Sequence, residues 1–135
     1  MSPPLYAGVS TNPNWFANVG TGYVLAKYGM TLITHGLSEE LKDYKIACST
    51  LWPRTMIATD AVKNLLGGDS SIRVSRSPEI MGDSAYEILT SKYCCVNGKY
   101  FLDDEVLAST GVKDFSKYRM TESVPEYDLW TDFIC

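Results

Sequence analysis

The sequence has little positive charge and no long apolar run, and each lack excludes a class of function. Its 135 residues contain 12 Lys and Arg against 16 Asp and Glu, a formal net charge of −4. Binding to nucleic acid requires a basic surface, so we expect no nucleic-acid partner. No apolar stretch approaches the ~20 residues that span a bilayer. The first residues, MSPPLYAGVS, lack the basic and apolar regions of a signal peptide. We therefore expect an intracellular protein without a membrane span, in the cytoplasm or alternatively in mitochondria or peroxisomes.

Residues that bind metals are also scarce. The cysteines, Cys48, Cys94, Cys95 and Cys135, do not have the spacing of a zinc site. A disulfide between the neighbours Cys94 and Cys95 would be strained. The single histidine, His35, lies inside an expected helix, where a packed or surface role is favoured over a catalytic one. We therefore expect reduced thiols and no metal.

The spacing of apolar residues predicts one long helix near the start of the chain. A loop over residues 1–14 precedes it, and the helix runs from about Asn14, whose side chain can cap it, to Leu41. Apolar and small residues at steps of three and four form one stripe: Leu25, Tyr28, Leu32, Gly36 and Leu37. Gly29 and Gly36 each cost roughly 1 kcal/mol relative to alanine inside a helix. That cost predicts a neighbouring element packed very close to them.

Shorter elements follow. The stretch KIACSTLWP is apolar on both faces and ends at Pro53, which is typical of a buried strand in a parallel sheet. The remaining pattern predicts a helix over 57–66, a loop over 67–77 (GGDSSIRVSRS), a helix over 79–90, a strand over 99–102 and a brief helix over 103–110. The tail, which contains aromatic residues without a clear period, is expected to lie along a surface.

These elements give an α/β class with only two strands. Two strands do not make a self-sufficient parallel sheet, and the first of them is expected to be central, with both edges requiring partners. We therefore expect residues 1–135 to form a single partial domain.

One spacing carries chemistry, the pair Tyr23 and Lys27 in TGYVLAKYGM. In a chain with nine tyrosines the spacing alone is a weak signal. On a helix, however, residues four apart lie on the same face, and an ammonium group favours the phenolate form of a tyrosine. Such a tyrosine can give a proton to a carbonyl oxygen or take one from an alcohol, beside a nicotinamide that transfers the hydride. The alternative is a surface Tyr–Lys contact worth roughly a few tenths of a kcal/mol.

Three blocks of the sequence resemble the short-chain dehydrogenase/reductase family. YVLAKYGMTLITHGLSEEL resembles its catalytic helix, KIACSTLWP the strand that follows, and VNGKYFLDD the last strand, in the family's order and at about its spacing. SPPL, NWF, AKYGM, LWPRT and DFSKY are similar to the hydroxysteroid-dehydrogenase-like branch. The resemblance implies the C-terminal half of a Rossmann-type doubly wound parallel sheet, with two strands and three to four helices.

The resemblance also implies roles for individual residues. Tyr23 would be the acid/base, and Lys27 would lower the pKa of Tyr23 and hydrogen-bond the nicotinamide ribose. Pro53 would open the loop that lies against the nicotinamide, and Ile57 and Thr59 would contact its carboxamide. All five are therefore expected to contribute to cofactor binding.

Two further positions carry open alternatives under the resemblance. The serine that holds the substrate oxygen is Ser2 by its motif or Ser10 by its distance from the tyrosine, and we prefer Ser2. Either could instead be an ordinary loop serine. Arg54 stands where the family usually has glycine, which makes the path of that loop less certain.

The glycine-rich cofactor fingerprint of the family is missing. Gly20 and Gly22 follow no strand, and Gly67-Gly68 end a helix. We therefore expect the N-terminal cofactor-binding half to be absent, which leaves two hypotheses. The chain is the C-terminal part of an NAD(P)-dependent oxidoreductase acting on an alcohol or carbonyl substrate. Alternatively, it is an inactive truncated fragment or assembly module, covered at its open strand edge by a second copy or by the missing half.

Overall fold

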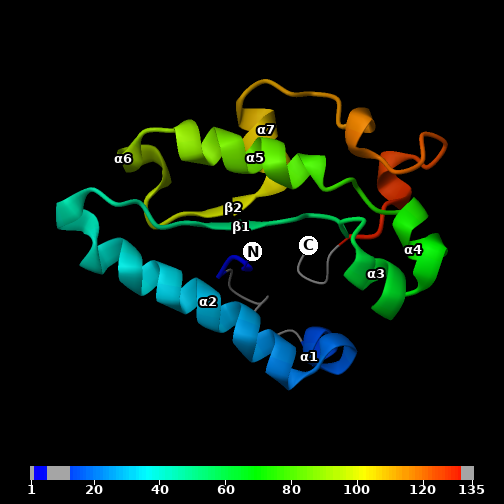
Figure 1. Ribbon diagram of the computed structural model, residues 1–135, viewed down its shortest axis with the longest axis horizontal. Helices are drawn as coiled ribbons and strands as arrows, with labels where there is room; N and C mark the ends of the chain where they lie inside the picture. The colour runs from blue at the N-terminus through cyan, green and yellow to red at the C-terminus, as the bar shows by residue number, and fades with distance from the viewer. Residues whose placement is uncertain (1, 6–12, 132–135) are drawn as a thin grey trace. The chain divides into compact units, whose positions relative to one another are not determined.

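The computed structural model describes residues 2–5 and 13–131 and divides the chain into two compact units (Figure 1). The first unit comprises Met1–Trp52 and Ile88–Leu102, and the second comprises Pro53–Glu87 and Asp103–Phe133. The candidate residues on the long helix therefore belong to the first unit, and those that follow the first strand belong to the second.

The first unit contains the two strands and the long helix. Its elements are α1 Pro13–Val19, α2 Thr21–Glu40, a 3₁₀ turn Lys42–Tyr44, β1 Thr50–Trp52, the end of α5 Glu79–Thr90, α6 Tyr93–Val96 and β2 Tyr100–Leu102. β1 and β2 pair in parallel, with Thr50 opposite Tyr100 and Trp52 opposite Leu102, and Figure 1 shows them side by side. The parallel pairing expected from the sequence is confirmed, although β1 covers only the end of the expected strand.

The long helix expected from Asn14 to Leu41 is interrupted. Gly20 lies between α1 and α2 with φ 82° and ψ 151°, a backbone conformation that glycine adopts without steric cost. The chain therefore turns at Gly20 and starts a second helix. The predicted cap was wrong, because Asn14 lies inside α1 and Gly20 occupies the cap position of α2.

Of the apolar stripe expected on α2, Tyr28 is buried but the leucines are not. Leu25 is 65% exposed and Leu32 is 60% exposed. The buried residues of α2 are Val24, Tyr28, Thr31 and Ser38. Two of these four are small polar residues that satisfy their hydroxyls on backbone carbonyls: Thr31 Oγ1 donates to the Pro3 carbonyl at 2.7 Å. The N-terminal segment therefore packs against the face of α2 that carries Thr31, while Leu25 and Leu32 remain exposed.

Gly29 and Gly36 in α2 have open space beside them. A Cβ built on Gly29 or Gly36 would meet no other atom within 4 Å. Within the described residues, the close-packed neighbour expected from these glycines is therefore not found.

Asn97 ties the strands of the first unit to the end of α2. Its side-chain oxygen accepts a hydrogen bond from the Cys48 amide at 2.9 Å, and its side-chain nitrogen donates to the Ser38 carbonyl at 3.0 Å. Cys94 and Cys95 nearby are exposed free thiols. The expectation of reduced cysteines is confirmed for these three cysteines, while Cys135 lies outside the described residues.

The second unit is mostly helical. Its elements are α3 Asp60–Leu65, α4 Gly68–Arg73, most of α5, α7 Asp103–Ser109 and the 3₁₀ turns Ser116–Tyr118 and Glu126–Asp128. The expected helices over 79–90 and 103–110 are confirmed as α5 and α7. The helix expected over 57–66 starts later, because Thr59 caps α3 by accepting a hydrogen bond from the Val62 amide at 3.3 Å.

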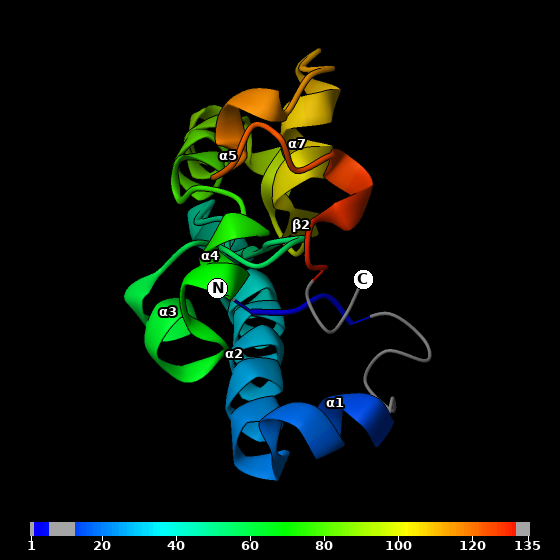
Figure 2. The same cartoon turned by 90° about the vertical axis from the view of Figure 1, so that its right-hand side faces the viewer.

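The stretch expected to be a loop over 67–77 contains helix α4. Gly67 and Gly68 both have positive φ and make the turn between α3 and α4, which lie against each other in Figure 2. The hydroxyls of Ser70 and Ser71 then donate to the carbonyls of Gly67 and Leu66 at 2.7 and 2.8 Å. The polar residues that suggested a loop therefore satisfy the ends of two short helices.

The core of the second unit is a cluster of Ile57, Ile80, Leu107 and Tyr118. Tyr118 is 2% exposed, and its hydroxyl donates to Asp83 Oδ2 at 2.6 Å. This hydrogen bond is the main cause that lowers the pKa of Asp83. The tail was expected to lie along a surface, and that expectation was wrong for Tyr118, which is part of the core.

Candidate active site

The first turns of α2 bring Tyr23 and Lys27 together. The Lys27 ammonium lies 5.5 Å from the centre of the Tyr23 ring and 5.9 Å from the centre of the Trp52 ring. Trp52 is the last residue of β1 and is 3% exposed, whereas Tyr23 is 45% exposed. In open parallel sheets, ligands bind outside the carboxyl ends of the strands. The pair therefore lies at the end of β1 where such sites form, with the tyrosine accessible.

Ser2 lies in the same unit as Tyr23 and Lys27, beside a separate cavity. It is 5% exposed and lines a cavity of about 440 Å³. The other lining residues come from α2 and from β1 with the residue before it: Met30, Ile33, Thr34, Ser49, Thr50 and Leu51. Tyr23 and Lys27 are not among the described residues that line this cavity. The alternative serine, Ser10, lies outside the described residues.

The other predicted cofactor residues lie in the second unit, in the segment from Pro53 to Thr59. Pro53 and Ile57 are buried, and the Ile57 side chain belongs to the core cluster. Ile57 forms a parallel bridge with Arg76, in which the Arg76 amide donates to the Met56 carbonyl at 2.9 Å and the Arg76 carbonyl accepts from the Ala58 amide at 2.8 Å. In a parallel bridge, the residue between the two hydrogen-bonded neighbours directs its own N–H and C=O away from the partner strand. The N–H and C=O of Ile57 therefore point away from Arg76, while Thr59 is exposed.

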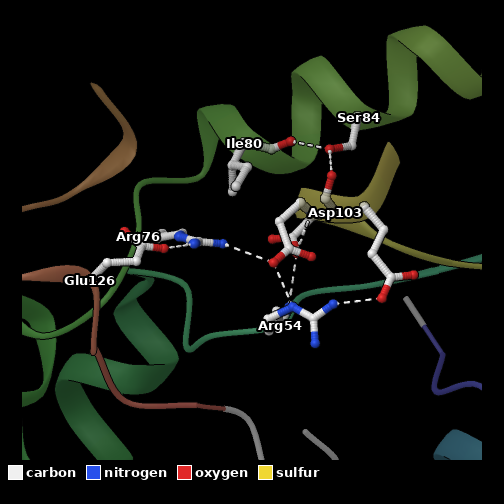
Figure 3. Close-up of polar contacts among 8 residues, drawn as sticks. Arg54, Arg76, Ile80, Ser84, Asp103 and Glu126 are labelled. Atoms are coloured by element: carbon white, nitrogen blue, oxygen red, sulfur yellow. Dashed lines mark hydrogen bonds and ion pairs between the residues drawn. The ribbon is translucent and has the colours of Figure 1, made fainter. Parts of the chain in front are cut away.

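A charged cluster that the sequence did not indicate surrounds the start of this segment (Figure 3). The Arg54 amide donates to Asp103 Oδ1 at 2.9 Å. The Arg54 guanidinium donates to Asp104 at 2.5 Å and to Glu105 at 2.7 Å. Arg54 stands at the position where the family usually has glycine. In this chain its side chain is held by carboxylates from the start of α7.

Arg76 adds a buried cation to the same cluster. Its side chain is 3% exposed, pairs with Glu126, and lies 3.9 Å from Asp104 and 5.4 Å from the centre of the Phe115 ring. Burial lowers the pKa of Arg76, and the carboxylates of Asp103 and Asp104 oppose that shift. A guanidinium nevertheless remains charged in proteins. Arg76 is therefore a permanent positive charge inside the second unit.

Asp103 is the most buried carboxyl group of the cluster. It has no exposed surface, and it receives hydrogen bonds on Oδ1 from the amides of Arg54 and Asp104. Burial raises the pKa of Asp103, and these two amides and the Arg76 charge oppose the shift. The only signal in the sequence was the Asp103-Asp104 pair, which directly follows the last expected strand.

The part of the chain that the structure describes provides neither a metal-binding cluster nor a membrane-spanning helix. The described residues include no group of three or more His, Cys, Asp and Glu side chains placed to bind a metal ion. Within the same part of the chain, no helix has both the length and the apolar character needed to cross a bilayer.

Comparison with known proteins gives clear relatives. No protein-family model matches the sequence. The chain is 41% identical over 133 residues to hydroxysteroid dehydrogenase-like protein 2 of Xenopus laevis and 35% identical to the protein of the same name in Homo sapiens. Each alignment covers 98% of this chain but 29% of the relative. The chain thus spans less than a third of the length of these curated relatives.

Solved structures agree with the sequence matches. A short-chain dehydrogenase of Mycobacterium thermoresistibile superimposes on 98% of the chain with a TM-score of 0.78 and 44% identity. The chain matches proteins of the short-chain dehydrogenase/reductase family over nearly its whole length. A dehydrogenase structure from Xanthomonas campestris superimposes on the whole chain with a TM-score of 0.83 and 40% identity. The chain covers 44% and 46% of these two short-chain dehydrogenase chains, and it matches the C-terminal half of their Rossmann-type fold. The fold class and the hydroxysteroid-dehydrogenase-like branch predicted from the sequence are confirmed.

Proposed function

We propose that this chain supplies the acid/base pair of an NAD(P)-dependent short-chain oxidoreductase that acts on an alcohol or carbonyl substrate. The observation that carries the proposal is the Lys27 ammonium 5.5 Å from the centre of the half-exposed Tyr23 ring, next to the last residue of β1. A cation at that position favours the phenolate form of the tyrosine. Because the Tyr23 ring is half exposed, its hydroxyl can reach a substrate oxygen.

The proposed reaction follows from this pair. In the oxidation direction, the Tyr23 phenolate takes the hydroxyl proton of an alcohol while the carbon loses a hydride. In the reduction direction, the Tyr23 hydroxyl gives its proton to the carbonyl oxygen as the carbon gains a hydride. The nicotinamide cofactor, when bound, accepts or supplies that hydride. Lys27 stabilises the negative charge that Tyr23 carries in one half of the cycle.

Residues of the second unit are proposed to contact the nicotinamide group, and their chemistry fits it. A carboxamide offers both donors and an acceptor, and the N–H and C=O of Ile57, which point away from Arg76, supply the complementary groups. The Thr59 hydroxyl accepts from the Val62 amide and retains its own proton to donate. Pro53, the first residue of the segment, has a φ fixed by its ring, which restricts the conformations open to the start of the segment.

Ser2 is the residue proposed to hold the substrate oxygen in the first unit. The support for this role is the resemblance carried by the SPPL motif, because the described lining of the 440 Å³ cavity beside Ser2 includes neither Tyr23 nor Lys27. The partner of the protein is therefore proposed to be a small alcohol or carbonyl compound. The exposed apolar residues of α2, such as Leu25 and Leu32, support the further expectation that this helix packs against more protein, a second copy or additional sequence of the fold.

Turnover by the full-length protein tests the proposed function. The protein is mixed with NADH or NADPH and a panel of ketones and aldehydes of increasing size, and the absorbance of the reduced cofactor is followed. We expect consumption of one of the two cofactors that depends on the carbonyl compound. No consumption with any member of the panel, or with alcohols and the oxidised cofactors, would contradict the proposal.

The 135-residue chain serves as the comparison in the same study. It lacks the glycine-rich turn that holds the pyrophosphate in this family. We expect it to leave the fluorescence of NADH and NADPH unchanged. Saturable binding by the chain alone would show that residues 1–135 contain a sufficient cofactor site.

A further inference from the structure

The segment from Pro53 to Thr59 is held at its middle and end by backbone hydrogen bonds. The Met56 amide donates to the Trp130 carbonyl at 2.9 Å, and the bridge to Arg76 holds the residues on either side of Ile57. These contacts fix the part of the segment that carries Ile57 and leads to Thr59. These contacts do not involve Pro53 and Arg54, the first two residues of the segment.

Asp103 provides that support at the start of the segment. Its carboxylate accepts the Arg54 amide proton at 2.9 Å and that of Asp104 at 2.8 Å (Figure 3). It has no exposed surface, so water does not compete for these hydrogen bonds. A carboxylate that accepts a backbone N–H forms a stronger bond than a neutral acceptor does.

Asp103 is itself fixed from the opposite side. The Ser84 hydroxyl of α5 donates to the Asp103 carbonyl at 2.9 Å and contacts the Ile80 carbonyl at 2.7 Å. Asp103 also follows β2 directly as the first residue of α7. The backbone of Asp103 is thus held by α5 and by its place at the start of α7.

We propose that Asp103 is a positioning residue that fixes the Pro53–Thr59 segment for the nicotinamide cofactor by accepting the Arg54 amide proton. The inference rests on the proposed function, because it assigns the segment to cofactor binding. It adds a residue that does not contact the cofactor and acts through the backbone. The Arg54 side chain, bound to Asp104 and Glu105, holds the same residue from a second direction.

The test compares two substitutions of Asp103 in the full-length protein. Asp103→Asn keeps an oxygen that accepts the Arg54 and Asp104 amides, and Asp103→Ala removes it. We expect Asp103→Ala to raise the Kd for NADH or NADPH, measured by fluorescence, about tenfold because buried amides lose their acceptor. Asp103→Asn is expected to stay within about twofold of the wild-type Kd.

Kinetics and a control variant separate positioning from general stability. We expect Asp103→Ala to raise the KM for the cofactor about tenfold, with a smaller fall in kcat at saturating cofactor. Ser71→Ala is the control, because it removes a buried hydroxyl of α4 that donates to the Leu66 carbonyl and has no part in holding Asp103. It is expected to lower the melting temperature and leave cofactor affinity unchanged. Equal losses of affinity in Ser71→Ala and Asp103→Ala would overturn the proposal.

Hydrogen exchange gives a readout that needs neither turnover nor a folded alanine variant. In the wild-type protein we expect the Arg54 amide to exchange slowly and to remain protected in Asp103→Asn. Rapid exchange of this amide in the wild type would overturn the proposal whatever the variants do. A wild-type protein that binds no cofactor would instead contradict the proposed function, and a protein that binds equally well with Asp103→Ala would contradict only the role of Asp103.

Discussion

Replacing Tyr23 with phenylalanine in the full-length protein is expected to lower kcat about 10³-fold, the range that a positioned acid or base contributes. The phenyl ring keeps the contact with the Lys27 ammonium, which lies 5.5 Å from the ring centre. Only the group that carries the proton is lost. The expected loss therefore appears in the chemical step, measured as the single-turnover rate of absorbance change with cofactor bound in advance.

Tyr44→Phe is a matched control for this substitution. Tyr44 is 76% exposed and lies in the 3₁₀ turn after α2, so it loses the same hydroxyl outside the candidate site. We expect its single-turnover rate to equal that of the wild type. If Tyr23→Phe also keeps the wild-type rate, Tyr23 is not the acid/base.

Replacing Arg76 with methionine is expected to destabilise the protein by about 3 kcal/mol at neutral pH, the cost of removing one partner from a buried charged cluster. Arg76 pairs with Glu126 and lies 3.9 Å from Asp104, and methionine restores the volume of the side chain but not its charge. Urea unfolding of wild-type and variant proteins measures the difference. Arg73→Met, at an exposed position in α4, is expected to change stability by less than about 0.5 kcal/mol.

The penalty of Arg76→Met depends on pH in a defined direction. Burial raises the pKa of Asp103 above its usual value of 3.8, and the Arg76 charge opposes that rise by favouring the ionised form. The favourable effect of Arg76 on Asp103 is therefore present when the pH is above the folded-state pKa. It is lost as the pH falls and Asp103 becomes protonated in both proteins. A penalty that stays constant, or grows, at lower pH would contradict the interpretation of the cluster.

The sequence predicted elements whose signals are local. Glu79–Thr90 was predicted because Pro78 and an acidic residue favour a helix start there, and the parallel pairing of the strands followed from an apolar stretch without alternation. The break at Gly20 was missed because the apolar stripe that predicted the helix begins only at Leu25, after the break. Gly68–Arg73 was missed because glycine and serine favour loops in general, while here the serine hydroxyls satisfy neighbouring carbonyls.

The candidate site was predictable only where its contacts join residues that are close together in the sequence. Tyr23 and Lys27 are four residues apart on one helix, so their contact follows from helix geometry. The hydrogen bond between Arg54 and Asp103 joins residues 49 positions apart, and the pairing of Arg76 with Glu126 joins residues 50 apart. No pattern in a single sequence indicates such pairs. The inward face of α2 also escaped prediction, because Thr31 satisfies its hydroxyl on Pro3, a contact that hydrophobic periodicity does not register.

The pH dependence of the reaction in wild-type and Lys27→Met proteins tests the central claim most directly. The rate of hydride transfer to the oxidised cofactor is measured in single turnovers between about pH 6 and pH 10, a range that includes the ordinary titration of tyrosine. Methionine keeps the aliphatic chain and removes the charge that favours the Tyr23 phenolate. We predict that the rise of the rate with pH moves to higher pH in Lys27→Met. The same dependence on pH in both proteins would contradict the account.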